Sequence, residues 1–574
     1  MVGLPARGKS YITKKLARYL NWLQHDTQIF NVGERRRDIA RKSMALADSS
    51  DSSDSSDSGS PNRDLVRSYR RLSMTTSSLN APVIAQDDDE ELPPPAVPSK
   101  ILVNGMDAEP ESEPPETDQK EDEKKEGGKE AKEPSTVVPA IDKPSTLPPH
   151  MRSSRSVSQS ADFFDPQNRS AVRIREQVAL DTLDELLDYV LDQGGSIGIL
   201  DATNSTITRR QTVVNRVRQR AGPDLNVLFL ESRCVDQALL EANMRLKLSG
   251  PDYRDQDPGQ ALADFKQRVA LYEQSYVPLG EYEEQRGMPY IQMIDVGRKM
   301  VSHRTNGFLS SQVVYYLLNF NLSPRQIWIT RHGESKDDQV GRIGGDSDLS
   351  ENGVRYAKAL AKFIDHERRE WELNQRQKEL LRHFPPRRGD STPNPSYVPV
   401  DSPRSFCVWS SMLKRSVETT AYFNEDEYDV KQMKMLDELN AGKMEGMTYD
   451  EIRQKYPEEY QHRKHDKMFY RYPGPGGEGY LDIIHRLRAV IIEVERTTDH
   501  VLLVSHRSVA RVLLAYFRGL KREEVADLDV PLGVLYMLEP KPYGVEFKAY
   551  RYNPGTDWFD YIPDFHLRQV KASH

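Results

Sequence analysis

GLPARGKS, residues 3 to 10, fits the pattern G-x-x-x-x-G-K-[ST]. In such a loop the glycines let backbone amides converge on phosphate oxygens, Lys9 reaches the outer phosphates, and the Ser10 hydroxyl can bind magnesium. From Lys9 to Leu23 apolar side chains recur at helical spacing, which predicts a helix that points its positive end at the phosphates. The stretch therefore predicts a nucleotide-binding loop on an α/β fold.

The segments that follow this loop alternate between strand and helix patterns. A long amphipathic helix is predicted from Ala171 to Asp192, and further helical stretches separate the strands. Strands that alternate with helices predict a parallel sheet covered on both faces. The predicted strands are TQIFNVG (27–33), SIGILDATN (196–204), LNVLFLES (225–232) and YIQMIDVG (290–297).

Residues 41–160 interrupt this first domain with polar, charged sequence that is poor in aromatic residues, such as SSDSSDSSDSGS (49–60). Such composition cannot bury enough apolar surface to fold, so we expect a disordered insertion. RRLS places Ser73, and SRSVS places Ser156, where a regulatory protein kinase could reach them. Serine-rich flexible sequence also contains such patterns by chance, so regulation here is a hypothesis.

A second series of strands and helices begins at QIWITRHGES (326–335). SFCVWS (405–410), a helix from Met412, HVLLVSH (500–506) and a closing helix continue it, and predict a second α/β domain. The Pro-rich stretch within 375–403 is typical of a surface loop insertion.

Composition excludes several classes of protein. A net charge of -8 argues against a general nucleic-acid binder. The two cysteines, Cys234 and Cys407, cannot build a disulfide framework, so a reducing, cytosolic location is expected. The apolar runs, such as VVYYLL (313–318), are far shorter than a bilayer span, and the N-terminus lacks a secretory pattern, so no membrane segment is expected.

Charged residues near the first sheet are candidate ligands of phosphates. Asp201 ends an apolar strand, where it can hold magnesium or approach an acceptor hydroxyl, or act only as a helix cap or turn residue. A guanidinium can bind a phosphate bidentately, although an arginine taken alone is more often a solvated surface residue. The candidate clamps are Arg36, Arg37, Arg175, Arg209 and Arg268.

Two histidines follow strands of the second domain. His332 comes directly after QIWITR, and His506 ends HVLLVS. A neutral imidazole can attack phosphorus, while Arg331, Arg415 and the second histidine neutralise the charge on the equatorial oxygens. Glu438 is the candidate acid for the departing alkoxide. A single strand-end histidine is usually structural, but two favour catalysis, and no cluster with metal-ligand spacing surrounds either.

In their order along the chain these motifs resemble the bifunctional 6-phosphofructo-2-kinase/fructose-2,6-bisphosphatase family, of the fungal type with a long insertion. The stretches that carry the resemblance are GLPARGKSY, RYLNWL, FNVGERRR, DATNSTITRR, SGPDY, RHGES, GRIGGDSDLS, YPEEY and RYPGPGGEGY. The resemblance implies a P-loop, nucleoside-kinase-like domain at 1–40 and 161–320 around the insertion at 41–160. A histidine-phosphatase, phosphoglycerate-mutase-like domain would follow at 325–560, with a tail at 561–574.

The resemblance also implies ligands for the first domain. ATP with Mg²⁺ would bind Gly3 to Ser10, including Gly8 and Lys9, with Lys247 as a second cation and Ser10 and Asp201 at the metal. Asp201 and Cys234 match positions associated with kinase activity. Fructose 6-phosphate would meet Arg36 or Arg37, Arg175, Thr203, Arg209, Arg268 and Tyr272.

For the second domain the resemblance implies that His332 accepts the phosphoryl group, Glu438 donates the proton and His506 assists, without any cofactor. The arginines and lysine among the implied contacts would bind the two phosphates of fructose 2,6-bisphosphate. The implied contacts are Gly344, Tyr449, Arg463, Lys467, Tyr480 and Arg511.

The chain departs from the family pattern at three places. A strand is implied before Gly3, of which the chain has only Met1 and Val2. Such a central strand would carry stability comparable with that of a domain, so we expect the kinase half to lack support. Asp338 stands where the family usually has asparagine, and Arg507 where it usually has glutamine. The two changes offset each other in charge, but they affect the phosphate site and hence substrate affinity.

Three hypotheses remain at this stage. The leading one is a bifunctional enzyme that makes and hydrolyses fructose 2,6-bisphosphate and so controls glycolysis. The second is a phosphatase whose kinase half is an inactive scaffold, which the short N-terminus favours. The third is a metabolite-sensing interaction protein. The family suggests a cytosolic homodimer, which nothing in the composition tests.

Overall fold

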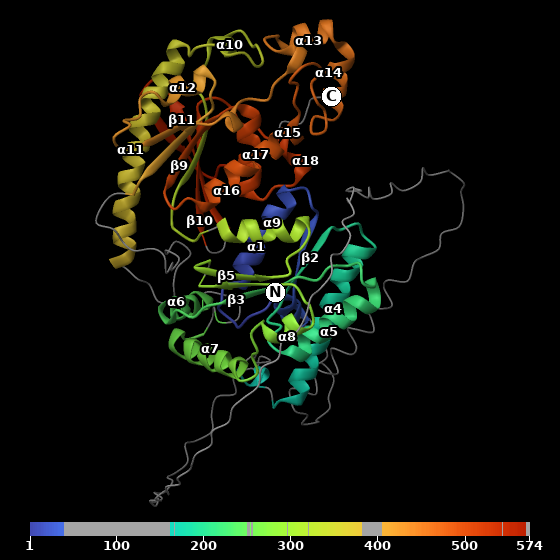
Figure 1. Cartoon of the computed structure of the whole chain (residues 1–574). Helices are drawn as coiled ribbons and strands as arrows, with labels where there is room; N and C mark the ends of the chain where they lie inside the picture. The colour runs from blue at the N-terminus through green and yellow to red at the C-terminus, as the bar shows by residue number, and fades with distance from the viewer. Residues whose placement is uncertain are drawn as a thin grey trace, which may run out of the picture. The chain divides into compact units, whose positions relative to one another are not determined.

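The computed structural model describes residues 1–39, 161–165, 167–248, 253, 256–295, 297–319, 321–380, 404–541 and 544–569 (Figure 1). Ser73, Ser156 and the predicted disordered insertion lie outside the described residues, as does 381–403 of the predicted surface loop.

The first domain has the predicted alternation of helices and short strands, and residues 32–39 add a helical segment after the first strand. Helix α4 begins at a side-chain cap, in which Asn168 accepts from the Ala171 amide. Its elements are α1 (Lys9–Trp22), β1 (Thr27–Asn31), η1 (Ala161–Phe164), α4 (Arg169–Leu191), β2 (Ile197–Asp201), α5 (Ile207–Ala221), β3 (Phe229–Arg233), α6 (Gln237–Lys247), α7 (Pro258–Glu273), α8 (Glu281–Gln285), β4 (Tyr290–Ile294), β5 (Lys299–His303) and α9 (Phe308–Asn319).

The strands of the first domain form two groups. β1 pairs with β2 in parallel, and β3 pairs with β4 in parallel. Residues 1–3 lie between the groups, because the Met1 nitrogen donates to the Leu200 carbonyl at 2.9 Å and the Val2 amide to the Leu230 carbonyl at 2.7 Å. The parallel arrangement is thus as predicted. The sequence patterns missed β5, which is antiparallel to β4.

Helices cover both faces of these strands, as predicted. α4 and α5 cover one face with a cluster that includes Leu187, Leu200 and Val217. α1 and α9 belong to another cluster, in which Leu16 and Tyr316 pack with Ile199 and Ile291. The apolar spacing of α1 therefore anchors the helix that starts at the phosphate loop.

The second domain contains one seven-stranded sheet in the order β12-β11-β10-β6-β9-β7-β8. β6, β9, β7 and β8 are parallel, whereas β10, β11 and β12 are antiparallel. The strands are β6 (Ile327–Arg331), β7 (Phe406–Ser410), β8 (Asp429–Gln432), β9 (His500–Ser505), β10 (Val534–Lys541), β11 (Gly544–Asn553) and β12 (Trp558–Ile562).

Helices of this domain cover both faces of the sheet (Figure 1). α11 packs Leu360 and Phe363 against one face, and α15 to α17 pack Ile491 and Leu513 against the other. The helices are α10 (Lys336–Gln339), α11 (Glu351–Leu380), α12 (Lys414–Thr420), α13 (Tyr449–Lys455), α14 (Pro457–His465), α15 (Tyr480–Arg486), α16 (Arg488–Arg496), α17 (Arg507–Arg518) and α18 (Arg522–Val525), with short 3₁₀ turns η2 (Lys434–Leu436) and η3 (Gly442–Met444).

Three boundaries predicted from the sequence are wrong. α17 is not the closing element, because the antiparallel strands β10 to β12 follow it. Residues 375–380 of the predicted surface loop continue α11, whose apolar and charged residues keep their helical spacing to Leu380. The predicted tail at 561–574 begins inside β12, and Leu528 forms a bridge with Gln569.

A buried ionic cluster joins the helix of the phosphate loop to the second domain. Glu495 on α16 accepts from Lys15 Nζ at 3.1 Å and also pairs with Arg18, and the Tyr516 hydroxyl donates to it at 2.7 Å. Glu495 and Lys15 are 1% and 7% exposed.

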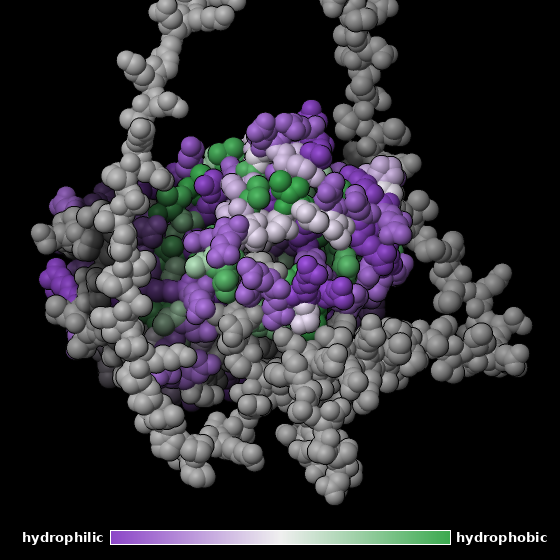
Figure 2. Space-filling view, turned by 90° about the horizontal axis from the view of Figure 1, so that it is seen from below, coloured by the Kyte–Doolittle hydropathy of each residue, from purple (hydrophilic) through white to green (hydrophobic). Residues whose placement is uncertain are grey.

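On the face in Figure 2, hydrophilic residues cover much of the coloured surface and hydrophobic ones lie in groups between them. Within the described residues, no helix is long and apolar enough to cross a membrane.

Two candidate active sites

The phosphate loop has the backbone that its glycines allow. Gly3 has a φ of +131°, and a Cβ there would lie 2.5 Å from the Ser232 carbonyl oxygen. Gly8, with a φ of 82°, is the left-handed residue at which α1 begins. Lys9 Nζ donates to the Leu4 carbonyl at 2.6 Å, and burial lowers the pKa of Lys9 to about 7. The loop therefore holds a desolvated lysine at the positive end of a helix.

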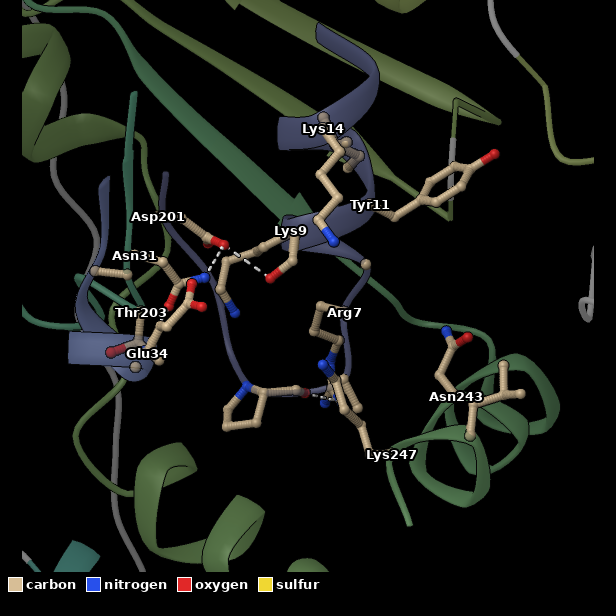
Figure 3. A pocket seen from close by; sticks show the side chains of 18 of the residues that line it. Arg7, Lys9, Tyr11, Lys14, Asn31, Glu34, Asp201, Thr203, Asn243 and Lys247 are labelled. Atoms are coloured by element: carbon tan, nitrogen blue, oxygen red, sulfur yellow. Dashed lines mark hydrogen bonds between the residues drawn. The ribbon is translucent and has the colours of Figure 1, made fainter. Parts of the chain in front are cut away.

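Asp201 lies beside this loop at the carboxyl end of β2. Its Oδ2 accepts from Ser10 Oγ at 2.8 Å and from Asn31 Nδ2 at 2.9 Å, and Figure 3 shows Asn31 next to it. The hydroxyl and carboxylate oxygens suit a nucleotide-bound Mg²⁺, which takes few protein ligands besides phosphates and water. Of the three roles left open for Asp201, its contact with Ser10 favours magnesium binding.

One cavity of about 1590 Å³ brings the predicted kinase residues together. Figure 3 shows Lys247 extending from α6 towards Arg7 and the phosphate loop. The lining includes Gly8, Lys9, Ser10, Arg36, Arg37, Arg175, Asp201, Thr203, Arg209, Lys247, Arg268 and Tyr272. Their individual roles stay predictions.

Phe164, in η1, packs against three of the predicted clamps. The guanidinium carbons of Arg268, Arg36 and Arg175 lie 3.8, 4.8 and 5.8 Å from the centre of its ring. The ring is 2% exposed. Cation–π contacts offset part of the repulsion among the three guanidinium groups, so one phenyl ring keeps them together beside the cavity. Arg209 pairs with Glu176 at 2.7 Å, and its Nη2 donates to the Arg175 carbonyl at 3.4 Å.

Two predicted residues do not line the cavity. Gly3 shapes the loop from behind, where its amide donates to the Thr203 carbonyl at 2.9 Å. Cys234 packs with the cluster that contains Ala6, and burial raises the pKa of its thiol to about 11. A protonated thiol at this place cannot serve as a nucleophile or base at neutral pH, and its predicted link to kinase activity stays untested.

His332 follows β6 and is held in one tautomer. Its Nδ1 contacts the Gly333 carbonyl at 2.7 Å, so Nδ1 carries the proton. Arg415 Nε donates to Nε2 at 3.1 Å. Burial, followed by the charges of Arg415 and Arg331, lowers the pKa of His332 to about 3. The imidazole is therefore neutral at physiological pH and presents the Nε2 lone pair as a nucleophile.

His506 follows β9, the parallel neighbour of β6, so the two rings lie 4.9 Å apart. Ser411 Oγ contacts His506 Nε2 at 2.7 Å, and Ser416 Oγ does so at 3.3 Å. Burial lowers the pKa of His506 well below its usual value. Its Nδ1 is buried without a hydrogen-bond partner in the part of the chain that the structure describes, which leaves this nitrogen available to a ligand.

Charged groups surround the two rings. Burial lowers the pKa of Arg331 to about 10, and the Arg507 charge adds to this effect. Asp338 Oδ1 lies 3.7 Å from Arg331 Nη2. Glu438 is half-buried, and its Oε1 accepts from the Ser508 amide at the start of α17 at 3.3 Å. Cations and one candidate acid thus meet at the carboxyl ends of β6 and β9.

Among the other predicted phosphatase residues, two pairs form hydrogen bonds, and Gly344 lies at a bend of its loop. Arg511 Nη1 donates to the Tyr480 hydroxyl at 2.8 Å, and Arg463 Nη2 to the Tyr449 hydroxyl at 3.2 Å. Burial and the charge of Arg511 lower the pKa of Lys467. Gly344 has a φ of +71° and lies beside Gly345, whose carbonyl accepts from Arg415 Nη1 at 2.7 Å. The loop therefore supports Arg415.

Three residues that contact the site residues were not predicted from the sequence. Asn31 ends β1 beside Asp201, so its position at a strand's carboxyl end was a usable signal. Ser411 directly follows β7, the other neighbour of β9, and gave the same signal. No such signal pointed to Phe164, because its arginine partners are distant in sequence.

A phosphate loop on one sheet and paired strand-end histidines on another define a phosphotransferase domain joined to a histidine phosphatase domain. The sequence model described as 6-phosphofructo-2-kinase matches residues 1–75 and 149–324, and that of the histidine phosphatase superfamily, branch 1, matches residues 401–553. The chain belongs to the 6-phosphofructo-2-kinase/fructose-2,6-bisphosphatase family. It has a domain of each kind.

Curated relatives agree with this assignment. "6-phosphofructo-2-kinase 1" of Saccharomyces cerevisiae is 50% identical over 72% of this chain and 48% of its own length. "Probable 6-phosphofructo-2-kinase PB17E12.14c" of Schizosaccharomyces pombe is 39% identical over 98% of this chain and 70% of its own length. "6-phosphofructo-2-kinase/fructose-2,6-bisphosphatase 3" of Homo sapiens is 32% identical over 96% of this chain and 75% of its own length. The chain thus spans about half of the first relative.

Proposed function

We propose that this chain synthesises fructose 2,6-bisphosphate from ATP and fructose 6-phosphate, and hydrolyses it back to fructose 6-phosphate. The observation that carries the proposal is the presence of both constellations: Lys9, Ser10 and Asp201 around one loop, and His332 and His506 at adjacent strand ends. These activities would set the level of a signal that controls glycolysis.

In the kinase reaction the 2-hydroxyl of fructose 6-phosphate attacks the γ-phosphorus of ATP and loses its proton to water, while the bond to the β-phosphate oxygen breaks and ADP leaves. Lys9 and Lys247 bind the nucleotide phosphates, and the arginines around Phe164 bind the 6-phosphate of the sugar. Ser10 and Asp201 would hold Mg²⁺, which would supply positive charge that neutralises the phosphates.

In the phosphatase reaction Nε2 of His332 attacks the 2-phosphorus, and the bond to the sugar oxygen breaks while Glu438 protonates that oxygen. Water, which loses its proton to Glu438, then attacks the phosphohistidine. The P–N bond breaks, and inorganic phosphate leaves. Arg331, Arg415 and Nδ1 of His506, in the tautomer that carries the proton there, stabilise the charge on the equatorial oxygens in both steps.

Family matches to both domains favour this bifunctional proposal over a phosphatase with an inactive kinase half. The cytosolic location, the homodimer and regulation by a protein kinase stay predictions.

The test is to separate the two activities by substitution. Lys9→Met should abolish ATP-dependent synthesis and leave hydrolysis of fructose 2,6-bisphosphate intact. His332→Ala should abolish both hydrolysis and the phosphoenzyme formed from 2-[³²P]-labelled substrate, and leave synthesis intact. Hydrolysis that survives His332→Ala, or synthesis that survives Lys9→Met, refutes the corresponding half of the proposal.

A further inference from the structure

Asp338 places a carboxylate beside the nucleophile of the phosphatase centre. Its Oδ2 lies 3.9 Å from His332 Nδ1, and its Oδ1 lies 3.7 Å from Arg331 Nη2. The side chain is 23% exposed. Arg331 is 5% exposed, and its Nη1 donates to the Val530 carbonyl at 3.2 Å. Among the described residues, Asp338 is the only acidic residue that forms an ion pair with Arg331.

The carboxylate is ionised and fixed in place. The Ser335 amide and hydroxyl donate to its Oδ2 at 2.9 and 2.6 Å, in the capping box that begins α10. Burial acts against ionisation, but the electrostatic interaction with His332, the two bonds from Ser335 and the charge of Arg331 outweigh it and lower the pKa of Asp338. A negative charge thus stands where a phosphoryl group bound to Arg331 and His332 would have to approach.

We propose that Asp338 is an affinity-limiting residue: its carboxylate competes with the phosphoryl group for Arg331 and weakens the binding of phosphate and phosphate esters to the histidine centre. The inference rests on the proposed phosphatase activity and deepens it. A site that held product phosphate with Arg331, Arg415 and Arg507 unopposed would release it slowly, and Asp338 removes part of that attraction.

The effect falls on binding rather than on the chemical step. The phosphoryl group carries negative charge both in the bound substrate and in the transition state, so a nearby carboxylate destabilises the two to a similar degree. Such uniform destabilisation raises KM and leaves kcat almost unchanged. A residue needed only for folding would not produce this split.

Arg507 acts in the opposite direction. It is exposed at the start of α17, directly after His506, and its charge acts on Arg331. Arg507 therefore supplies positive charge near Arg331, whose charge Asp338 partly neutralises. Arg507→Gln should weaken phosphate binding, and combining it with Asp338→Asn should return the affinity towards that of the unaltered chain.

The experiment compares Asp338→Asn with the unaltered full-length chain. Asparagine keeps an oxygen for the two bonds from Ser335, so α10 keeps its cap. Binding of inorganic phosphate, measured by calorimetry, should tighten about tenfold, the order expected for one charge near 4 Å at a partly exposed site. KM for fructose 2,6-bisphosphate should fall by a similar factor, with kcat changed less than about threefold.

Asp348→Asn is the matched control. Asp348 pairs with Lys336 of the same short helix at 3.1 Å and is 48% exposed, so its removal should leave phosphate affinity within about twofold. Asp338→Ser removes the same charge and serves if Asp338→Asn does not fold.

Unchanged or weaker phosphate binding in both Asp338 variants overturns the inference. Phosphate binding needs no turnover, so a chain that binds phosphate as described but hydrolyses no fructose 2,6-bisphosphate would refute the proposed function alone.

Discussion

Glu495 offers a quantitative test of how the two domains depend on each other. Its carboxylate on α16 contacts Lys15 and Arg18 of α1, the helix that begins at the phosphate loop. Glu495→Gln keeps the shape of the side chain but removes its charge. Lys15 and Arg18 then stay buried without their carboxylate partner, which lowers the free energy of unfolding. We therefore expect Glu495→Gln to destabilise the chain.

The structure gives the size of the effect. Burial alone would raise the pKa of Glu495, but the charges of Lys15, Arg18 and Arg325 lower it from 4.5 to about 2. Such a shift corresponds to about 3 kcal/mol at neutral pH, since one pKa unit is worth about 1.4 kcal/mol. Breaking a buried pair costs about 3 to 5 kcal/mol by comparison with other proteins. The expected loss of unfolding free energy is therefore about 3 kcal/mol.

The sign of the pH dependence follows from the same shift. Because the folded state lowers the pKa, the contribution is complete above pH 4.5 and is lost as the pH falls towards about 2. The assay is urea unfolding followed by tryptophan fluorescence, since Trp22 lies in this cluster with its ring 5.6 Å from that of Tyr516. Unfolding at pH 7 and at pH 4 should differ less for Glu495→Gln than for the unaltered chain.

Glu493→Gln is the control on the same helix. Glu493 is 40% exposed and pairs only with Arg496 among the described residues, so its loss should cost less than about 0.5 kcal/mol. If Glu495→Gln destabilises the chain no more than Glu493→Gln does, the ionic cluster does not hold α1 against the second domain.

Three further predictions concern single side chains. Phe164→Leu removes the ring between the guanidinium groups, so KM for fructose 6-phosphate should rise about tenfold with kcat and the KM for ATP within twofold; an unchanged KM in a coupled kinase assay contradicts this. Because the pKa of Lys9 is about 7, ATP binding at pH 8 should take up a proton, as calorimetry in buffers of different ionisation enthalpy measures, and Lys9→Met should abolish the uptake; equal uptake in both chains would argue against it. Burial lowers the pKa of His500 to about 3, so its contribution to stability is complete above pH 6.5 and falls by about 1.4 kcal/mol for each pH unit below it. His500→Gln should reduce the loss of stability between pH 6 and pH 5 in urea unfolding, and a pH dependence equal to that of the unaltered chain would exclude this role.

The sequence predicted the parts of the sites that depend on local pattern. Lys9, Asp201, His332 and His506 each follow a strand or open a helix, and parallel strands bring such ends together. The antiparallel strands β10 to β12 were missed, because Val534–Lys541 and its neighbours mix apolar residues with charged ones and follow a strong helical pattern.

Contacts between distant segments were beyond local pattern. Phe164 meets Arg36, Arg175 and Arg268 only because η1 packs beside α7 and α4, and Glu495 meets α1 across 477 residues of chain. Neither residue differs in type or spacing from an ordinary core or surface residue. Asp338 was noticed in the sequence, but its distance from Arg331 needed the fold.

The hydrogen bond between His332 Nδ1 and the Gly333 carbonyl has a chemical consequence. Because Nδ1 carries the proton, phosphorus would bond only to Nε2 in the proposed phosphatase reaction, and the covalent intermediate would be the tele isomer of phosphohistidine rather than the pros isomer. Antibodies that discriminate the two isomers can therefore report the imidazole orientation in a cell extract, without any crystal.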